Sequence, residues 1–422
     1  MKAPVERVRR LPLWQPLAVR DFRLLWLGQS ISLFGDQFYL VALYWLVQHV
    51  SGSGVALGTV LMVAGASQAL FQLIGGAVGD RFPPRTLMLG SDILRTAITL
   101  LITLIVYLNV TQLWHLYVLS AIFGSVEAFF YPAYMSAIPM LIMNDHLPAG
   151  NALLRGTRRL MASIGPPIAG VVITSVSLTA AFGIDAITFV LSAITLWLMR
   201  QRRREETAED AQAGAIRSAT PEGLIKSIGD GLRYAFNHKI VWPLLIYVSV
   251  IEFSFVGPST VGLAVMARQR FGGDEGASAL GWMLGAFGAG MLIGMLLAGS
   301  LRIKQHRGRL IITLVFTIGL GLAMLSFATH VIWAAVVLAL MGLGGGLANI
   351  LILSWMQETA DPRMLGRVMS LMMFAVAGLE PLSFLLAGIV ADVSLIWVFI
   401  GGGTIMIITS LLSLGSAILN AD

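Results

Sequence analysis

Residues 200–239 read RQRRREETAEDAQAGAIRSATPEGLIKSIGDGLRYAFNHK, a charged stretch that divides two long apolar parts of the chain. A segment this polar does not cross a lipid bilayer. On each side of it, apolar runs of about 20 residues recur, and each is long enough to cross roughly 30 Å of hydrocarbon as a helix. We therefore predict that residues 200–239 form a linker between two membrane-embedded halves.

The composition agrees with a membrane protein. Of the 422 residues, 57% are hydrophobic and 12% are charged, whereas soluble globular proteins carry roughly 25% charged residues. The net charge is +6, but the basic residues fall in short runs between apolar segments, which argues against nucleic acid as a partner. The chain has no cysteine, so it has neither disulfides nor thiolate metal sites, and no metal or other cofactor is predicted.

Breaks at charged residues, prolines and glycines divide the apolar runs into about twelve predicted helices. The fold class is therefore an all-α membrane protein with two six-helix halves. We predict an N-terminal segment at 1–23, a first half at 24–199, the linker at 200–239, a second half at 240–418 and a tail at 419–422. The twelve predicted spans are 24–50, 55–79, 87–109, 114–142, 151–177, 179–199, 240–269, 277–301, 310–329, 331–357, 365–391 and 395–418.

The distribution of Lys and Arg predicts the orientation. With twelve spans, nearly all basic residues fall on the side of the N-terminus, and only Arg268 and Arg270 fall on the other side. Cytoplasmic loops carry this excess of basic residues, so we predict a multi-pass protein of the plasma (inner) membrane with both termini in the cytoplasm. The basic groups on that side are the N-terminal tail, Arg81, Arg85, 155–159, 200–239, 302–309, Arg363 and Arg367.

Residues 76–85, GAVGDRFPPR, carry the most specific motif. They resemble the cytoplasmic signature G-x-L-A-D-R-x-G-R-R of the major facilitator superfamily, with matches at Asp80, Arg81 and Arg85. Pro83 and Pro84 replace the usual Gly and Arg. The resemblance implies the major facilitator fold, with a central cavity between the halves and a cytoplasmic gate to which Asp80, Arg81 and Arg85 contribute.

A second motif lies in the fifth predicted span. Gly165, Pro166, Pro167 and Gly170 form a pattern similar to the antiporter motif of exporters in the same superfamily. FRLLWLGQSISLFGDQF (22–38) and GIDAITFVLSA (183–193) are similar to the branch that contains macrolide efflux pumps and the enterobactin exporter. This branch implies proton-coupled export. Without the resemblance, the Gly and Pro residues indicate only tight packing and a local bend.

Four carboxylates lie near the middle of predicted spans: Asp36, Glu127, Glu252 and Glu380. An acid at this depth costs roughly 2.5–3.5 kcal/mol on insertion scales, and burial favours its protonated form. Arg95 is only about two turns into its span, so we expect no basic side chain at the depth of the acids. These residues are candidates for binding protons; the alternative is a protonated acid that only forms hydrogen bonds.

The resemblance places spans 1, 4, 7 and 10 around the central cavity, which makes Asp36 the first candidate for the coupling carboxylate and Glu127 the second. Asp185 lies in a peripheral span and is expected to be structural. Asp92 and Arg95 are three residues apart on one helix face. We expect them to join the cytoplasmic gate or, as the alternative, to anchor the membrane edge of their helix.

Aromatic residues flank three of the acids and are candidates for a pocket that binds bulky lipophilic or cationic ligands. The alternative is that they face lipid or neighbouring helices. The candidates are Phe38, Tyr39, Phe129, Tyr131, Tyr134 and Phe253.

The predicted function is secondary active export of small lipophilic or cationic compounds by proton antiport and alternating access. The expected partners are a small-molecule substrate, protons and membrane lipids, and the chain is expected to act as a monomer. No Walker sequence and no nucleophile–base or metal constellation is present, so the protein is not predicted to be an enzyme. The alternatives are a transporter of a specific cargo (a siderophore, a macrolide-like product or a lysolipid) and a membrane sensor or scaffold that does not transport.

Overall fold

The computed structural model describes residues 13–79, 81–200, 233–238, 240–272, 275–300, 306–359, 361 and 364–414. All regular secondary structure in these ranges is helical. Most of the predicted linker and the C-terminal tail lie outside them. Eleven helical segments of the described residues are long and apolar enough to cross a membrane. The helix α5 (Leu147–Ser175) is not one of them, and Arg155, Arg158 and Arg159 lie in its first half.

The helices of the first half are α1 (Arg20–Ser51), α2 (Gly54–Gly79), α3 (Pro84–Tyr107), α4 (Leu113–Leu141), α5 (Leu147–Ser175) and α6 (Leu178–Leu198). The second half begins with α9 (Val241–Gly257), which continues through a π-helical turn (Pro258–Gly262) into α10 (Leu263–Phe271). It is completed by α11 (Gly276–Ser300), α12 (Arg307–Met324), α13 (Val331–Thr359), α14 (Leu365–Val393) and α15 (Leu395–Ser413).

Most helix ends lie within four residues of the predicted ones. An exception is α12, which ends at Met324 because the 3-10 turn Leu325–Phe327 follows it, whereas the prediction was 329. The predicted end of the last span, residue 418, lies outside the described residues.

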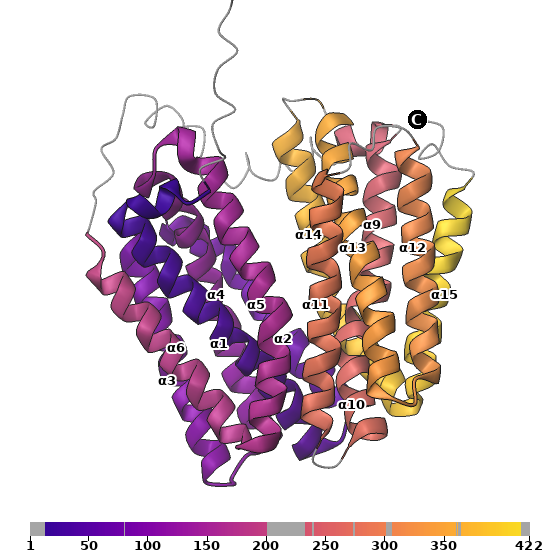
Figure 1. Ribbon diagram of the computed structural model, residues 1–422, viewed down its shortest axis with the longest axis horizontal. Helices are drawn as coiled ribbons and strands as arrows, with labels where there is room; N and C mark the ends of the chain where they lie inside the picture. Colours follow the sequence, from indigo (N-terminus) through magenta and orange to yellow (C-terminus); the bar gives the residue numbers. More distant parts are fainter. Residues whose placement is uncertain are drawn as a thin grey trace, which may run out of the picture.

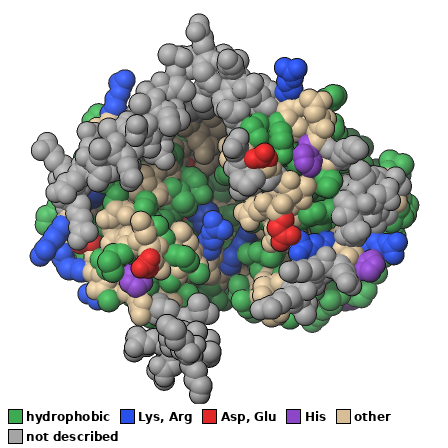
Figure 2. Space-filling view, turned by 90° about the horizontal axis from the view of Figure 1, so that it is seen from above, with side chains coloured by type: hydrophobic (Ala, Val, Ile, Leu, Met, Phe, Trp, Pro, Cys, Tyr) green, Lys and Arg blue, Asp and Glu red, His purple; other side chains and the backbone are tan. Residues whose placement is uncertain are grey.

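The two halves lie side by side as separate helical bundles (Figure 1). The start of α1 and the end of α15 lie at the same face of the molecule, and we call this face the terminal face. Towards this face the bundles diverge, and towards the opposite face they converge (Figure 1). Figure 2, which looks onto the terminal face, shows the molecule hollowed between the halves, with basic side chains on the walls of the hollow.

The contact between the halves is made mainly by two helix pairs, α5 with α11 and α2 with α14. Small residues allow this close approach. A methyl group at Gly170 of α5 would lie 2.6 Å from the carbonyl oxygen of Ala277, and one at Gly281 of α11 would collide with the carbonyl oxygen of Pro166. Lipid provides no hydrophobic drive for helix association, so backbone approach of this kind is a main source of packing energy in a membrane.

Replacement of Gly281 by Ala is expected to disturb this contact, because the added methyl group meets backbone atoms that cannot rotate away. Overpacking costs about 1–3 kcal/mol, so the purified variant should unfold at a lower temperature. Gly183 of α6 is the matched control, since no atom lies within 4 Å of a methyl group added there. Equal melting temperatures for Gly281→Ala and Gly183→Ala would contradict the proposed packing role.

Candidate functional site

A cavity of about 400 Å³ lies on the inner side of the second half. All six helical segments of this half contribute to it, and Arg159 of α5 reaches it from the first half. The guanidinium of Arg159 lies 3.3 Å from the sulfur of Met291, so the cavity is bounded by both halves. Its other lining residues are Val248, Ile251, Glu252, Phe255, Val256, Phe287, Val315, Ile318, Met341, Gly345, Ala348, Asn349, Ile352, Met372 and Met406.

The walls of this cavity are mostly apolar and include flexible methionine side chains and aromatic rings. Four methionines line it, Met291, Met341, Met372 and Met406; their unbranched thioether side chains adapt to differently shaped ligands. The rings of Phe255 and Phe287 lie 5.5 Å apart. Charged or amide groups are contributed by Arg159, Glu252 and Asn349. Such a cavity suits a mainly apolar compound that carries few polar groups.

A side chain of α14 contacts the backbone of the helix that carries Glu252 directly after that residue. The Ser383 hydroxyl of α14 donates to the carbonyl oxygen of Phe253 at 2.5 Å and accepts from the Gly257 amide at 2.8 Å. The hydroxyl thus lies between a carbonyl and an amide that an ordinary α-helix joins by a direct hydrogen bond. The π-helical turn begins at the next residue, Pro258. An inserted hydroxyl satisfies backbone groups that the membrane interior cannot, and it fixes the position of the Glu252 backbone against α14.

The four predicted acids fall into two groups, one in each half. Glu252 lines the cavity and interacts electrostatically with Glu380, which is half-buried on α14. In the first half, Asp36 is half-buried on α1, and it interacts electrostatically with the half-buried Glu127 of α4.

The expectation that no basic side chain reaches the depth of the acids is wrong. Arg95 is 5% exposed and interacts electrostatically with Asp36, Asp92 and Asp185. Its guanidinium lies over the rings of Phe123, Phe130 and Phe189, at 5.7, 4.6 and 5.5 Å from the ring centres. Three aromatic faces stabilise the cation in this buried position, which is how an arginine is accommodated between α3, α4 and α6.

Asp92 and Asp185, both 0% exposed, lie on either side of Arg95 along the contact between α3 and α6. The Ser192 hydroxyl of α6 donates to Asp92 at 2.7 Å, and the Thr99 hydroxyl of α3 donates to Asp185 at 3.4 Å. The structure therefore places Asp92 and Arg95 inside the first half. Their predicted place in a cytoplasmic gate stays a prediction, because Asp80 lies outside the described residues.

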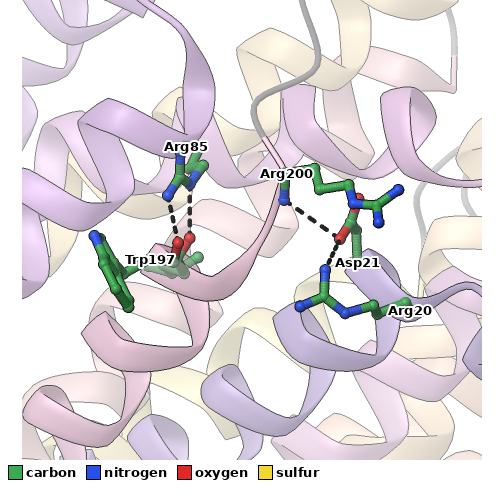
Figure 3. Close-up of polar contacts among 6 residues, drawn as sticks. Arg20, Asp21, Arg85, Trp197 and Arg200 are labelled. Atoms are coloured by element: carbon green, nitrogen blue, oxygen red, sulfur yellow. Dashed lines mark hydrogen bonds and ion pairs between the residues drawn. The ribbon is translucent and has the colours of Figure 1, made fainter.

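The other predicted gate residues lie at the terminal face. Arg81 is exposed. Arg85 donates to the carbonyl oxygens of Leu196 and Trp197 at the end of α6 (Figure 3). A cation at a helix C-terminus satisfies its last carbonyl groups, so this contact fastens α3 to α6 within one half.

A second polar contact at this face also joins the two ends of the first half. The Asp21 carboxylate accepts from the Arg200 amide at 3.4 Å and forms an ion pair with Arg20 at 3.6 Å (Figure 3). Asp21 is in the first turn of α1, and Arg200 follows α6.

At the opposite face, polar contacts join the two halves. Arg268 at the end of α10 donates to the carbonyl oxygen of Gln48 in the last turn of α1. Asp392 near the end of α14 accepts from the Ser53 hydroxyl at 2.5 Å and from the Gly54 and Val55 amides at the start of α2. Each charge complements the dipole of the helix end that it meets, a cation at a C-terminus and an anion at an N-terminus.

The predicted antiporter motif lies in the contact between the halves. Pro166, Gly170 and neighbouring residues of α5 pack on α11, and Gly165 of the same motif packs against Gln37 of α1. The motif thus touches the residue next to Asp36 on one side and the second half on the other.

The predicted aromatic residues are not brought together in one cavity. Phe38, Tyr39 and Tyr134 are buried within the first half, where Tyr39 stacks on Phe123 at 4.6 Å. Phe129 lines a separate groove between α2, α3 and α4. The remaining two, Tyr131 and Phe253, are half-buried.

Several residues of this site were missed in the sequence. Arg268 is at the end of a predicted span and Asp392 directly follows one, so both look like ordinary charges at a membrane edge, and Ser383 looks like an ordinary serine. The signal at Asp185 was available, since it is an acid within the apolar run GIDAITFVLSA. Its distance from Asp36 in sequence concealed their proximity in the fold.

The fold and sequence are both similar to those of known transporters. The chain is 22% identical over 373 residues to macrolide efflux protein A of Streptococcus pyogenes, covering 88% of this chain and 89% of that protein. It is 26% identical over 373 residues to the multidrug efflux pump Tap of Mycobacterium tuberculosis, covering 85% and 84%. Among solved structures, a peptide transporter POT matches with a TM-score of 0.71 at 15% identity, covering 97% of this chain and 99% of that one.

A family match covers most of the chain. Residues 25–379, from the first helix to α14, match the Major Facilitator Superfamily. With two six-helix halves that meet at α5–α11 and α2–α14, this match shows that the chain belongs to the major facilitator superfamily of membrane transporters.

Proposed function

We propose that this protein exports small lipophilic or cationic compounds in exchange for protons. The observation that carries the proposal is the cavity of about 400 Å³ with four methionines, two phenylalanines and one carboxylate, Glu252, in its walls. The apolar, adaptable walls accept compounds of different shapes, Glu252 is placed to pair with a cationic group of the cargo, and Arg159 lies at the boundary with the first half. The similarity to a macrolide efflux protein and a multidrug efflux pump supports the same substrate class.

The arrangement of the halves supports alternating access. The hollow between them opens at the terminal face, whereas Arg268 and Asp392 hold the halves together at the opposite face. The excess of basic residues at the terminal face supports a cytoplasmic location for it. The molecule would then be open to the cytoplasm, ready to accept cargo from inside the cell.

The proton is the proposed source of energy. Mid-membrane acids are present in both halves, with Asp36 and Glu127 in the first half and Glu252 and Glu380 in the second. A carboxyl group that is protonated in one conformation and ionised in the other couples proton flow to the conformational change. Asp36 is the proposed coupling residue because it is half-buried and its neighbour in the chain, Gln37, packs against the α5 motif that contacts the second half.

The test is accumulation of a panel of lipophilic cationic dyes and macrolides in pump-deficient cells that express the protein. We expect lower accumulation than in cells with an empty vector, and we expect a protonophore to abolish the difference. An effect that survives the protonophore would contradict proton coupling. The absence of any effect, with the protein present in the membrane, would contradict this substrate class.

Replacement of Glu252 by Gln should discriminate between cationic and neutral cargo. A hydrogen bond to a charged group contributes about 1.5–3 kcal/mol, so loss of the charge should weaken export of a cationic dye by roughly tenfold to a hundredfold. Export of a neutral compound should change much less. Asn349→Asp, in the same cavity, is the converse variant and should favour the cation. Equal loss for both compounds in Glu252→Gln would contradict direct recognition of the cationic group.

A further inference from the structure

The buried charges of the first half do not balance. Three carboxylates, Asp36, Asp92 and Asp185, interact electrostatically with one guanidinium, that of Arg95. If all three acids were ionised, the cluster would carry a net charge of −2. Each uncompensated ion in such surroundings costs several kcal/mol. A neutral cluster therefore contains one ionised acid, which balances Arg95, and two protons on the other acids.

Three polar atoms of this cluster are buried without a hydrogen-bonding partner in the part of the chain that the structure describes. The Oδ1 atoms of Asp92 and Asp185 and the Nε atom of Arg95 are buried and have no hydrogen-bonding partner among the described residues. Buried polar atoms are nearly always satisfied. An ionised carboxylate whose oxygen has no donor is destabilised in this buried position. A protonated carboxyl group carries no charge and therefore loses less free energy when it is buried.

Close packing of α1 on α6 brings Asp185 against α1 at Gly35, the residue before Asp36. At Gly35, next to Asp36 in the chain, a methyl group would lie 2.8 Å from the Asp185 Oδ1 atom. Gly28, two turns earlier on the same face of α1, packs in the same way against Ser192 and Thr195 of α6. Two glycines seven residues apart thus bring α1 onto the polar side of α6, which a bulkier residue would prevent.

We propose that Asp185 is a second proton-binding carboxyl group behind Asp36, and that the two acids share the coupling protons while Arg95 compensates the remaining negative charge. This inference rests on the proposed proton antiport. In the shared step, a proton leaves a carboxyl oxygen of Asp36 and binds a carboxylate oxygen of Asp185. One O–H bond breaks, one forms, and the negative charge moves from Asp185 to Asp36.

The arrangement gives the two acids different roles. Asp36 is half-buried, whereas Asp185 is 0% exposed, so protons reach Asp185 by way of Asp36. The other titratable and charged groups that act on the pair are Tyr39 of α1, Asp92 and Arg95 of α3, Glu127 of α4 and Arg158 of α5. Asp92 accepts from the Ser192 hydroxyl at Oδ2 (2.7 Å) and has no donor at Oδ1 among the described residues, so it is the acid that keeps its own proton while the negative charge that balances Arg95 moves between Asp185 and Asp36.

The test uses infrared spectroscopy of the full-length protein in liposomes, without any cargo, while the pH is raised. The carbonyl stretch of buried protonated carboxyl groups is followed in wild type, Asp185→Asn, Asp36→Asn and the control Glu275→Gln, which changes an exposed acid. Asp185→Asn is expected to remove part of this band. The remaining band should disappear at a lower pH than in wild type, because Asp36 has lost a like-charged neighbour. Glu275→Gln should change neither property.

An Asp185→Asn spectrum with wild-type amplitude and midpoint would overturn the inference and leave Asp185 as an acceptor for Thr99 alone. Loss of part of the band without any change in the midpoint would also overturn it, since the two acids would then titrate independently. If Asp185→Asn does not insert, Asp185→Glu, which keeps the carboxyl group, is used and should retain the full band at a shifted midpoint. Dye efflux by the same variants distinguishes failure of this inference from failure of the proposed export. If the two acids titrate together but the protein exports no dye, only the proposed function is contradicted. If the protein exports dye at the expense of the proton gradient but the two acids titrate independently, only this inference is contradicted.

Discussion

Cells that express Asp36→Asn are expected to accumulate dye to the same level as cells with an empty vector. The amide occupies nearly the volume of the carboxyl group and still forms hydrogen bonds, but it does not exchange a proton in the physiological range. Transport that depends on the proton gradient should therefore stop although the protein is present in the membrane. The measurement is dye accumulation with and without a protonophore, together with the amount of protein in the membrane fraction.

Glu275→Gln is the matched control for this experiment. It also changes an acid to its amide, but at an exposed position, and it should transport like wild type. Asp36→Glu keeps the titrating group and should retain part of the activity. Unchanged, protonophore-sensitive efflux by Asp36→Asn would show that another acid carries the coupling proton.

Oxidation of the double variant Ser53→Cys/Asp392→Cys is expected to stop transport almost completely. The Ser53 hydroxyl and the Asp392 carboxylate lie 2.5 Å apart and belong to different halves. A disulfide between these positions would hold the start of α2 against the end of α14, so the opposite face could not open. Because the natural chain has no cysteine, the two introduced thiols are the only ones present.

The expected result is loss of efflux after treatment with a mild oxidant and recovery after reduction. Each single variant, treated in the same way, should keep the activity that it has before treatment. Formation of the cross-link, detected by mass spectrometry of the digested protein, with no loss of efflux would show that these helix ends stay together throughout the transport cycle. That outcome would contradict a gate at this face.

Much of the fold was predictable because the bilayer restricts the possible structures. A segment that crosses lipid must satisfy its backbone internally, so each apolar run of about 20 residues predicted a helix, and most of the observed ends agree. The signature at 76–85 and the motif at Gly165 and Gly170 predicted the family, and residues 25–379 match it. The two bundles agree with the predicted fold of two halves (Figure 1), whereas the division at the polar stretch 200–239 stays a prediction because most of that stretch lies outside the described residues.

The candidate site was only partly predictable. The four mid-membrane acids were evident in the sequence because a charge in an apolar run is costly wherever the helix lies. The sequence did not show which of the acids lie close together in the fold. The side chain of Arg95 reaches the acids from α3 because three phenylalanines of α4 and α6 surround its guanidinium, and these residues come from segments far apart in the chain.

The sequence by itself determined that the chain lies in a lipid bilayer, the approximate ends of most of the described helices and the presence of acids within apolar spans, because each of these depends on the local density of apolar and charged residues. Only the tertiary structure decided that Asp185 packs against Gly35, that Ser383 is inserted into the backbone of α9, and that Asp392 meets the start of α2. The physical reason is that such contacts depend on which faces of distant helices approach each other. Interhelical packing and small residues fix that approach, and no local pattern of the chain records it.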